Sequence, residues 1–484
     1  MGRAGGRIHC KEMATVGEIV FPYIANSVPS VKKRMMDEIG IKSADDIFAE
    51  IPEHLRYKGT LNLPKPLLSE YEMRRHVEGL LAKNSSCEDH LSFLGGGTWQ
   101  HYVPAVVDTI IERDEFLTAY VGDAYADHGK FQAMFEMASM VGELVDMDVV
   151  NTPTYDWANA IAIAVRMAAR MNGRKEILVD ASMSPKRLAV VKNYCLPDIT
   201  VKLLDFDRVQ GGMNLEDLKA KISSATSAVY FENPSYLGFI EGHGEEIARI
   251  THAVGAELIV GVDPSSLGVL TPPAQYGADI VCGELQPLGI HMQWGGGLSG
   301  FIATRDEPKY VAEYPSLLFG LTTTTQEGEH GFGQVYYERT SYASRERGKD
   351  FIGTTTALYG IAAAVYLALM GPQGMRDLGL GIMQRAAFAA DLLGALPGVK
   401  APYIAAPGFK EFVVNFDGTG KTVAEINQAL LQQGIFGGKD LSGEFPELGQ
   451  SALYAFTEVH TKDDIRRLAL ALDEALAAFP QVKA

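Results

Sequence analysis

Residues 282–300 read CGELQPLGIHMQWGGGLSG. A strand-like run over residues 279–283 leads into this stretch, and a second one over residues 300–304 follows its glycine triplet. The two apolar runs predict two strands of a buried sheet, joined by a polar loop. The chain has no lysine between Pro264 and Pro308. The loop after the first strand, where Gln286 and Pro287 stand, therefore carries no reactive amine.

Strand-like and helix-like segments alternate upstream of this stretch, from about residue 150 onward. Strands are predicted over residues 175–180, 199–206, 226–234 and 257–264, and helices over residues 157–173, 184–195, 214–223 and 243–255. Strands that alternate with helices favour a mostly parallel sheet covered by helices on both faces. The sequence therefore predicts an α/β fold.

The flanking regions predict further domains. Residues 1–90 read as an N-terminal helical arm, with an amphipathic helix over residues 68–86. Residues 91–355 form the predicted large α/β domain. Two alanine-rich helices over residues 355–400, followed by alternating strand and helix patterns, predict a small α+β domain over residues 356–484.

Composition and charge limit the classes to which the protein can belong. The 484 residues are 47% hydrophobic, and the formal net charge of −17 argues against general binding to nucleic acid or to an anionic membrane. No apolar run reads as a membrane span or a signal peptide, and the four cysteines are scattered. We therefore expect a cytoplasmic protein without a disulfide framework. No histidine pair has zinc spacing, so we expect no metal.

Two polar residues in this frame are candidate catalytic groups. Asp263 ends an apolar strand, and ligands of open parallel sheets collect at the carboxyl ends of strands. An aspartate there can hold the ring nitrogen of pyridoxal phosphate (PLP) protonated, or it can simply cap the turn. His101, in a loop-rich segment, can stack on a flat ring or transfer a proton, or it can be an ordinary loop histidine.

Glycine-rich loops are candidate cofactor-binding segments, because backbone N–H groups free of side chains can approach a phosphate. The candidates are Gly95, Gly96 and Gly97 in one loop, and Gly295 and Gly296 in the other. Glycine triplets alone are weak signals. His128 and His291, each near glycine, are weaker candidates for the substrate pocket.

The chain resembles a known family over nearly its whole length. The matching stretches are LNLPKPLLSEYEM (61–73), residues 92–120, residues 143–162, ENPSYLGFIE (232–241), residues 262–290 and YLALMGPQG (366–374). The most specific of them is GADIVCGELQPLG (277–289). These stretches are similar to those of the α, or N-terminal, subunit of glycine dehydrogenase (decarboxylating), the P-protein of the glycine cleavage system.

The resemblance implies a fold-type-I PLP transferase-like fold and a divided enzyme. The α subunit of that family lacks the Schiff-base lysine, which a β subunit supplies together with the PLP, and the two form a heterotetramer. Gln286, a candidate cofactor neighbour, and Pro287 then stand where the β subunit has its lysine. The implied reaction decarboxylates glycine and passes the aminomethyl group to the lipoyl arm of H-protein. A chain without the lysine is not expected to act alone.

Differences from the family gather in the loops. Residues 121–129, 155–160 and 350–355 depart from the usual pattern, and Trp157 replaces a glycine. Further candidates are Tyr120 for catalysis and, for the substrate pocket, Tyr155, Trp157 and Asn159. Two alternatives stay open: a divergent paralogue that acts on another small amino acid or amine, and a non-catalytic scaffold subunit.

Overall fold

The computed structural model describes residues 20–21, 23–117, 128–335, 348, 350 and 352–478. The chain divides into two compact units, residues 1–84 and residues 85–484, and each is described by itself. The predicted domain boundaries after residues 90 and 355 stay predictions.

The first unit carries two α-helices joined by extended segments and 3₁₀ turns. Helix α1 (Pro29–Ile39) starts with a proline and ends at Gly40, whose φ of 76° suits a glycine. Helix α2 (Glu70–Leu81) is capped by the Ser69 side chain and is the amphipathic helix that the sequence predicts. The described helices of this unit bury none of their residues.

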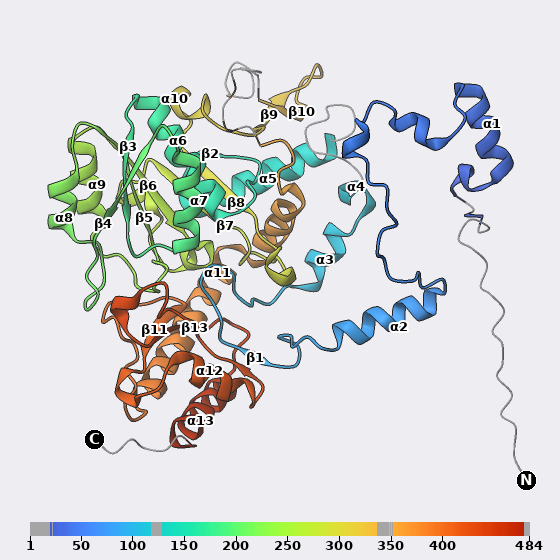
Figure 1. Cartoon of the computed structure of the whole chain (residues 1–484). Helices are drawn as coiled ribbons and strands as arrows, with labels where there is room; N and C mark the ends of the chain where they lie inside the picture. The colour runs from blue at the N-terminus through green and yellow to red at the C-terminus, as the bar shows by residue number, and fades with distance from the viewer. Residues whose placement is uncertain are drawn as a thin grey trace, which may run out of the picture. The chain divides into compact units, whose positions relative to one another are not determined.

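The second unit is built on a seven-stranded sheet (Figure 1). Its strands are β2 (Val149–Val150), β3 (Glu176–Asp180), β4 (Thr200–Leu204), β5 (Thr226–Glu232), β6 (Glu257–Val262), β7 (Ile280–Glu284) and β8 (Gly300–Thr304), in the order β2-β8-β7-β6-β5-β3-β4. The pairs from β7 to β4 are parallel, and β8 runs antiparallel to β7 and β2. The prediction of a mostly parallel sheet is confirmed.

Helices cover both faces of this sheet. One face packs on α6 (Trp157–Asn172) and α7 (Pro185–Cys195). The other face packs on α5 (His128–Val145), α8 (Leu215–Lys221), α9 (Gly244–Ala253) and the first half of α11 (Ala357–Gly394). β5 is buried along its whole length, as a strand covered on both faces must be. Shorter elements of this unit are α3 (Ala105–Ile111), α4 (Asp114–Leu117), α10 (Pro308–Val311) and the hairpin of β9 (Phe319–Thr323) and β10 (His330–Gln334).

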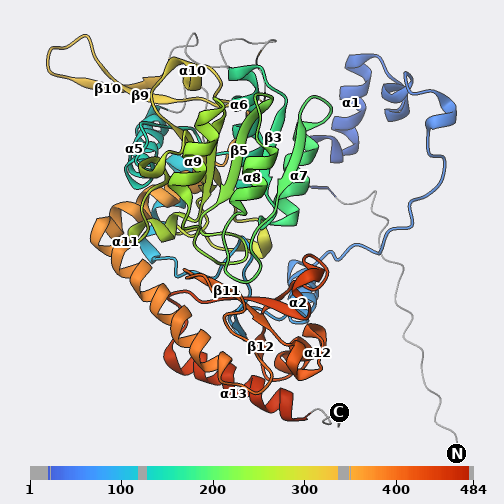
Figure 2. The ribbon, with the colours of Figure 1, turned by 90° about the vertical axis from the view of Figure 1, so that its left-hand side faces the viewer.

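Helix α11 continues from the sheet to the C-terminal part of the chain (Figure 2). The two alanine-rich helices of the prediction form this one element, which is kinked where Gly371 (φ 58°) precedes Pro372. By length and composition alone α11 could cross a membrane. It packs on α3, α5 and α13 (Lys462–Ala478), however, and this packing accounts for its apolar residues.

A smaller three-stranded sheet follows α11. Its order is β11 (Glu411–Asn415), β14 (Ser451–Ala455) and β13 (Lys439–Asp440), with α12 (Val423–Leu431) and α13 packed on it. The N-terminal strand β1 (Leu91–Ser92) pairs with β12 (Ile435–Phe436) of this part. We call residues 401–478 the small lobe, and the seven-stranded sheet with its helices the large lobe.

Candidate functional site

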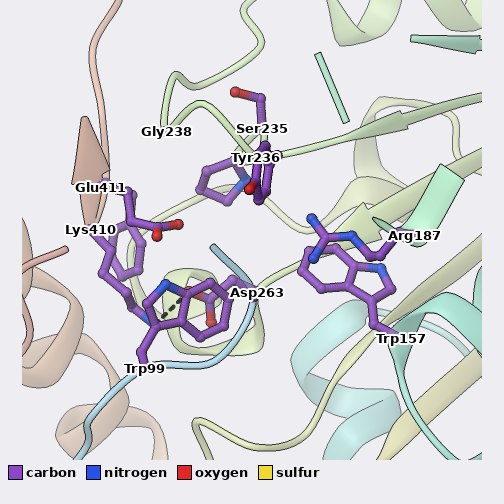
Figure 3. A pocket seen from close by; sticks show the side chains of 12 residues that line it. Trp99, Trp157, Arg187, Ser235, Tyr236, Gly238, Asp263, Lys410 and Glu411 are labelled. Carbon is purple, nitrogen blue, oxygen red and sulfur yellow. Dashed lines mark ion pairs between the residues drawn. The ribbon is translucent and has the colours of Figure 1, made fainter. Parts of the chain in front are cut away.

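A cavity lies where the carboxyl ends of β5 and β6 meet the start of β11 and the glycine loop of residues 95–97 (Figure 3). Ligands of open α/β sheets bind at this edge. The cavity volume is about 20 Å³, which admits about one water molecule. Its walls come from both lobes: Gly97, Trp99, Trp157, Arg187, Pro234, Ser235, Tyr236, Gly238 and Asp263 from the large-lobe side, and Phe409, Lys410 and Glu411 from the small lobe.

Asp263 follows β6 and is 4% exposed. Its Oδ1 accepts hydrogen bonds from the Ser265 N–H (3.0 Å) and hydroxyl (2.7 Å), so the carboxylate caps the 3₁₀ turn that starts at Pro264. Its Oδ2 lies 2.7 Å from the ammonium nitrogen of Lys410. Of the two roles considered for Asp263, the turn cap is present, and the other oxygen binds a cation of this chain.

Lys410 is 2% exposed and uses its three N–H groups inside the protein. One donates to Asp263, and a second donates to His101 Nε2 at 2.8 Å. The third has the ring of Trp99 within reach, with Nζ 4.0 Å from the ring centroid. A buried ammonium is stable only when its donors are satisfied, and these contacts satisfy them.

His101 connects Lys410 to the small-lobe carboxylate Glu458. His101 Nδ1 lies 2.9 Å from Glu458 Oε2, and Glu458 Oε1 accepts from the Tyr102 N–H at 2.7 Å. Burial is the main cause that lowers the pKa of His101, and the Lys410 cation lowers it further. Since lysine only donates, the hydrogen bond from Lys410 makes Nε2 an acceptor, and Nδ1 carries the proton that Glu458 accepts. His101 thus joins two charged side chains, and its role in proton transfer stays a prediction.

The glycine loop binds an internal carboxylate. The Gly96 N–H donates to Glu411 Oε1 at 2.7 Å. A Cβ atom at Gly95 would lie 2.0 Å from the same oxygen and 2.8 Å from Ala455 Cβ, so any side chain there would displace the Glu411 carboxylate. Burial raises the pKa of Glu411 to about 7, against the opposing effect of this backbone hydrogen bond. The loop that was predicted to approach a phosphate thus approaches a side chain of the small lobe.

The opposite wall of the cavity includes Trp157 and Arg187, and Glu232 holds Arg187 in place. Arg187 donates to both carboxylate oxygens of Glu232, at 2.8 Å and 2.7 Å. Its guanidinium lies over the Trp157 ring, 4.2 Å from the centroid. This bidentate pair uses two of the five N–H groups of the guanidinium, and Arg187 also lines the cavity.

Glu284 and Gln286, of the loop after β7, both bind backbone groups. Glu284 accepts from three N–H groups: Ser299 at 2.6 Å, Trp157 at 3.1 Å and Gln286 at 3.2 Å. It therefore fills the N-terminal anion position of α6. Gln286 is fully buried and binds the backbone of Trp99. Neither residue lines the cavity.

Several other candidate residues lie away from the cavity. His291 pairs with Asp108 at 3.0 Å on the surface, and Gly295 and Gly296 form an exposed turn. Tyr155 is 45% exposed and bonds to Thr354, while Asn159 is buried and donates to the Tyr194 hydroxyl.

Two of the predicted site residues cannot be placed here. Tyr120 lies outside the described residues, as does the side chain of His128. The structure thus brings together Asp263, His101, Gly95–Gly97, Trp157 and the backbone clamp of Gln286, and their functional roles stay predictions.

Comparison with known proteins decides the family. The family model "Glycine cleavage system P-protein" matches residues 23–472. The chain belongs to this family. It is 40% identical to "Probable glycine dehydrogenase (decarboxylating) subunit 1" of Staphylothermus marinus, over 92% of this chain and 96% of that protein. It is 38% identical to the protein of the same name from Pyrococcus furiosus, over 94% and 99% of the two chains.

Solved structures agree with this assignment. The chain superposes with a TM-score of 0.82 on the inhibitor-bound crystal structure of a glycine decarboxylase (P-protein) of the glycine cleavage system, at 32% identity and with coverage of 94% and 100%. A sphingosine-1-phosphate lyase from Burkholderia pseudomallei, at 13% identity and a TM-score of 0.62, shares the fold alone. The predicted fold-type-I PLP-enzyme fold is confirmed.

PLP, the cofactor that this fold implies, does not fit the cleft of this chain. The cavity has room for about one water molecule. Lys410 is bound to Asp263, and Glu411 accepts from the Gly96 N–H. Among residues 20–21, 23–117, 128–335, 348, 350 and 352–478, no group of three or more His, Cys, Asp or Glu side chains is placed to hold a metal ion.

Sequence reasoning missed the small-lobe residues Lys410, Glu411 and Glu458, and also Arg187. Lys410 and Glu411 open the apolar run of β11, and two charged residues before a strand are usually solvated. Glu284 stood inside the most specific motif, and a glutamate that ends a fully apolar strand was a usable signal of a buried carboxylate.

Proposed function

We propose that this chain is subunit 1 of a two-part glycine decarboxylase of the glycine cleavage system. In this proposal a second, lysine-bearing subunit carries PLP, and the pair decarboxylates glycine and passes the aminomethyl group to the lipoyl arm of H-protein. Membership of the family supports it, as do the names of relatives that match over 90% of this chain. We place the pair in the cytoplasm, as a heterotetramer without membrane or nucleic acid.

One observation supports the division of the reaction between two subunits. Strand β7 ends at Glu284, and Gln286 and Pro287 follow it in a stretch without lysine. The lysine that does lie in the cleft, Lys410, is bound to Asp263 and His101. A covalent PLP enzyme needs a free amine beside the cofactor, so the amine must come from another chain.

The test begins with isolation of the full chain from its native extract, with mass spectrometry of the proteins that accompany it. We expect a lysine-bearing homologue with bound PLP, seen in the absorption spectrum of the complex. The complex should exchange labelled bicarbonate into glycine, and the chain alone should not. Exchange by the chain alone, or a complex without a PLP-bearing partner, would overturn the proposal.

A second candidate function is the same chemistry on another small amino acid or amine. Trp157, which replaces a glycine of the family, motivates it. The Trp157 side chain packs on Arg187 and lines the cavity of this chain. The measurement that separates the two is turnover by the reconstituted pair of glycine against alanine, serine and methylamine. Preference for one of the latter would favour the second candidate.

A scaffold role without influence on chemistry is the third possibility. It predicts that substitution of His101 or Asp263 leaves the turnover of the partner unchanged at equal complex concentration. A fall in turnover by the intact complex would exclude it.

A further inference from the structure

We propose that this chain fills its own cofactor cleft with Lys410 and Glu411, and that these two residues join the small lobe to the large lobe. Lys410 stands opposite Asp263, where the ring nitrogen of a cofactor would lie, and Glu411 takes the Gly96 N–H, which a phosphate would otherwise be able to use (Figure 3). The cleft is then a structural centre, whichever reaction the chain serves.

The surroundings of Lys410 are built for an ammonium group. Asp263 (2.7 Å), His101 (2.8 Å) and the Trp99 ring (4.0 Å) face its three N–H groups from three directions. A lysine that merely collapsed into an empty cleft would leave donors unsatisfied, at a high cost in a buried site. The match of three donors to three partners indicates a specific site for a primary ammonium ion.

Both carboxylate oxygens of Asp263 also have hydrogen-bond partners inside the protein. Oδ1 takes two hydrogen bonds from Ser265, and Oδ2 takes the Lys410 ammonium. A protonated ring nitrogen from outside would have to displace Lys410 and leave a cation buried without its carboxylate. That exchange is unfavourable, so the cleft should reject PLP.

The start of β11 supplies the second contact between the lobes. Glu411 follows Lys410 directly, and its carboxylate reaches the Gly96 N–H. Close approach fixes this arrangement, because a Cβ at Gly95 would meet Glu411 Oε1 at 2.0 Å and one at Gly238 would meet the Glu411 carbonyl oxygen at 2.2 Å. Two consecutive residues of the small lobe therefore contact Asp263 and the glycine loop.

His101 extends this network, because it binds Lys410 on one side and Glu458 on the other, both in the small lobe. Glu458 follows β14, the strand that pairs with β11. The network of Asp263, Lys410, His101 and Glu458 thus ties the large lobe and the loop of His101 to the small lobe. Its loss should loosen the segments on both sides.

The first experiment measures access to the cleft of the full chain. An amine-reactive reagent, followed by peptide mass spectrometry, should modify Lys400, which is exposed in the adjacent segment, and leave Lys410 unmodified. Equilibrium dialysis against PLP should give no stoichiometric uptake. Modification of Lys410 as fast as that of Lys400 would overturn the proposal. Uptake of one PLP per chain that Asp263→Asn abolishes would also overturn it.

The second experiment tests the site by chemical rescue. Lys410→Ala should lower the melting temperature, and n-butylammonium should restore part of the loss, whereas tetramethylammonium, which has no N–H, should not. Lys400→Ala should respond to neither ion. Absence of selective rescue in a folded Lys410→Ala protein would overturn the proposal.

Should that variant not fold, Asp263→Asn/Lys410→Met provides the second route. Removal of both charges should give a higher melting temperature than Asp263→Asn alone, because no unpaired ammonium remains. If the Lys410→Met change lowered the melting temperature of Asp263→Asn further, as an independent second loss would, the result would contradict the pairing of the two side chains.

Discussion

Gln286 binds the backbone of Trp99 through both ends of its amide. Oε1 accepts from the Trp99 N–H at 3.1 Å, and Nε2 donates to the Trp99 carbonyl at 2.9 Å. The same Nε2 also donates to the Ile290 carbonyl at 3.1 Å. Gln286, in the loop after β7, therefore acts as a clamp. It holds the loop on which Trp99 and His101 stand.

Gln286→Leu should therefore destabilise the protein. Leucine has about the same size as glutamine but cannot form hydrogen bonds. The substitution therefore leaves three buried backbone groups without partners, each at a cost of about 1–3 kcal/mol. Urea denaturation of the full chain measures the difference in the free energy of unfolding. Gln275→Leu, at an exposed position, is the matched control and should change that free energy by less than about 0.5 kcal/mol. Equal effects of the two substitutions would contradict the clamp.

Glu284→Gln should be destabilising although it is nearly isosteric. The carboxylate offers two acceptor oxygens to three N–H groups, and an amide would turn an NH₂ group toward either Ser299 or Trp157. One donor would then face another, at a cost of about 1–3 kcal/mol. The matched control is Glu474→Gln on the exposed face of α13. Unchanged stability of Glu284→Gln would mean that the oxygens do not both accept.

The central strands of the large lobe, β3, β5, β6 and β7, could be predicted because each is an apolar run that is buried almost throughout and ends at a polar turn. β5 and β6 are examples, with Glu232 and Asp263 at or just after their ends. The position of Asp263 at the ligand-binding edge follows from the same rule. The sequence does not predict that Lys410 lies opposite Asp263, because Lys410 lies 147 residues further along the chain and meets Asp263 only when the lobes pack.

The glycine loop is a second place where the sequence does not predict a contact between distant segments. Residues 95–97 could be predicted to let another group approach closely, since glycine has no side chain. Whether that group is a ligand or the Glu411 carboxylate depends on where β11 starts relative to the loop. The sequence contains no local signal for this distance.

Stability should fall as the pH rises from about 5 to about 7, in part through Glu411. Burial raises its pKa from 4.5 to about 7 in the folded protein. Between these values the folded chain keeps a proton that the unfolded chain has released. Its contribution is therefore fully present below pH 4.5 and is lost as the pH rises through 7, by at most about 1.4 kcal/mol per pH unit.

Glu411→Gln removes this titration and should flatten the dependence of the free energy of unfolding on pH in that range. Denaturant titrations at half-unit steps from pH 5 to 8 measure it. Glu474→Gln should retain the slope of the unmodified protein. Asp180, whose pKa burial also raises to about 7, remains in both variants, so the slope should fall without vanishing. A slope as steep in Glu411→Gln as in the unmodified chain would refute the assignment.

The pair of Arg187 and Glu232 should show strong coupling in a double-mutant cycle. Both side chains are buried, and the two hydrogen bonds of 2.8 Å and 2.7 Å are their main compensation for lost hydration. Arg187→Met should cost about 3–5 kcal/mol, because Glu232 is left buried without a cation. Arg187→Met/Glu232→Gln should cost clearly less than the sum of the single variants, since no unpaired charge remains.

The exposed pair of Arg249 and Glu246 on α9, which is also joined by two hydrogen bonds, is the matched control. Its cycle should give a coupling of less than about 1 kcal/mol, because water screens both charges. Denaturant unfolding of each variant supplies the energies. Additive losses at Arg187 and Glu232 would mean that the wall of the cavity is held by packing of Arg187 on Trp157 instead of by the ion pair.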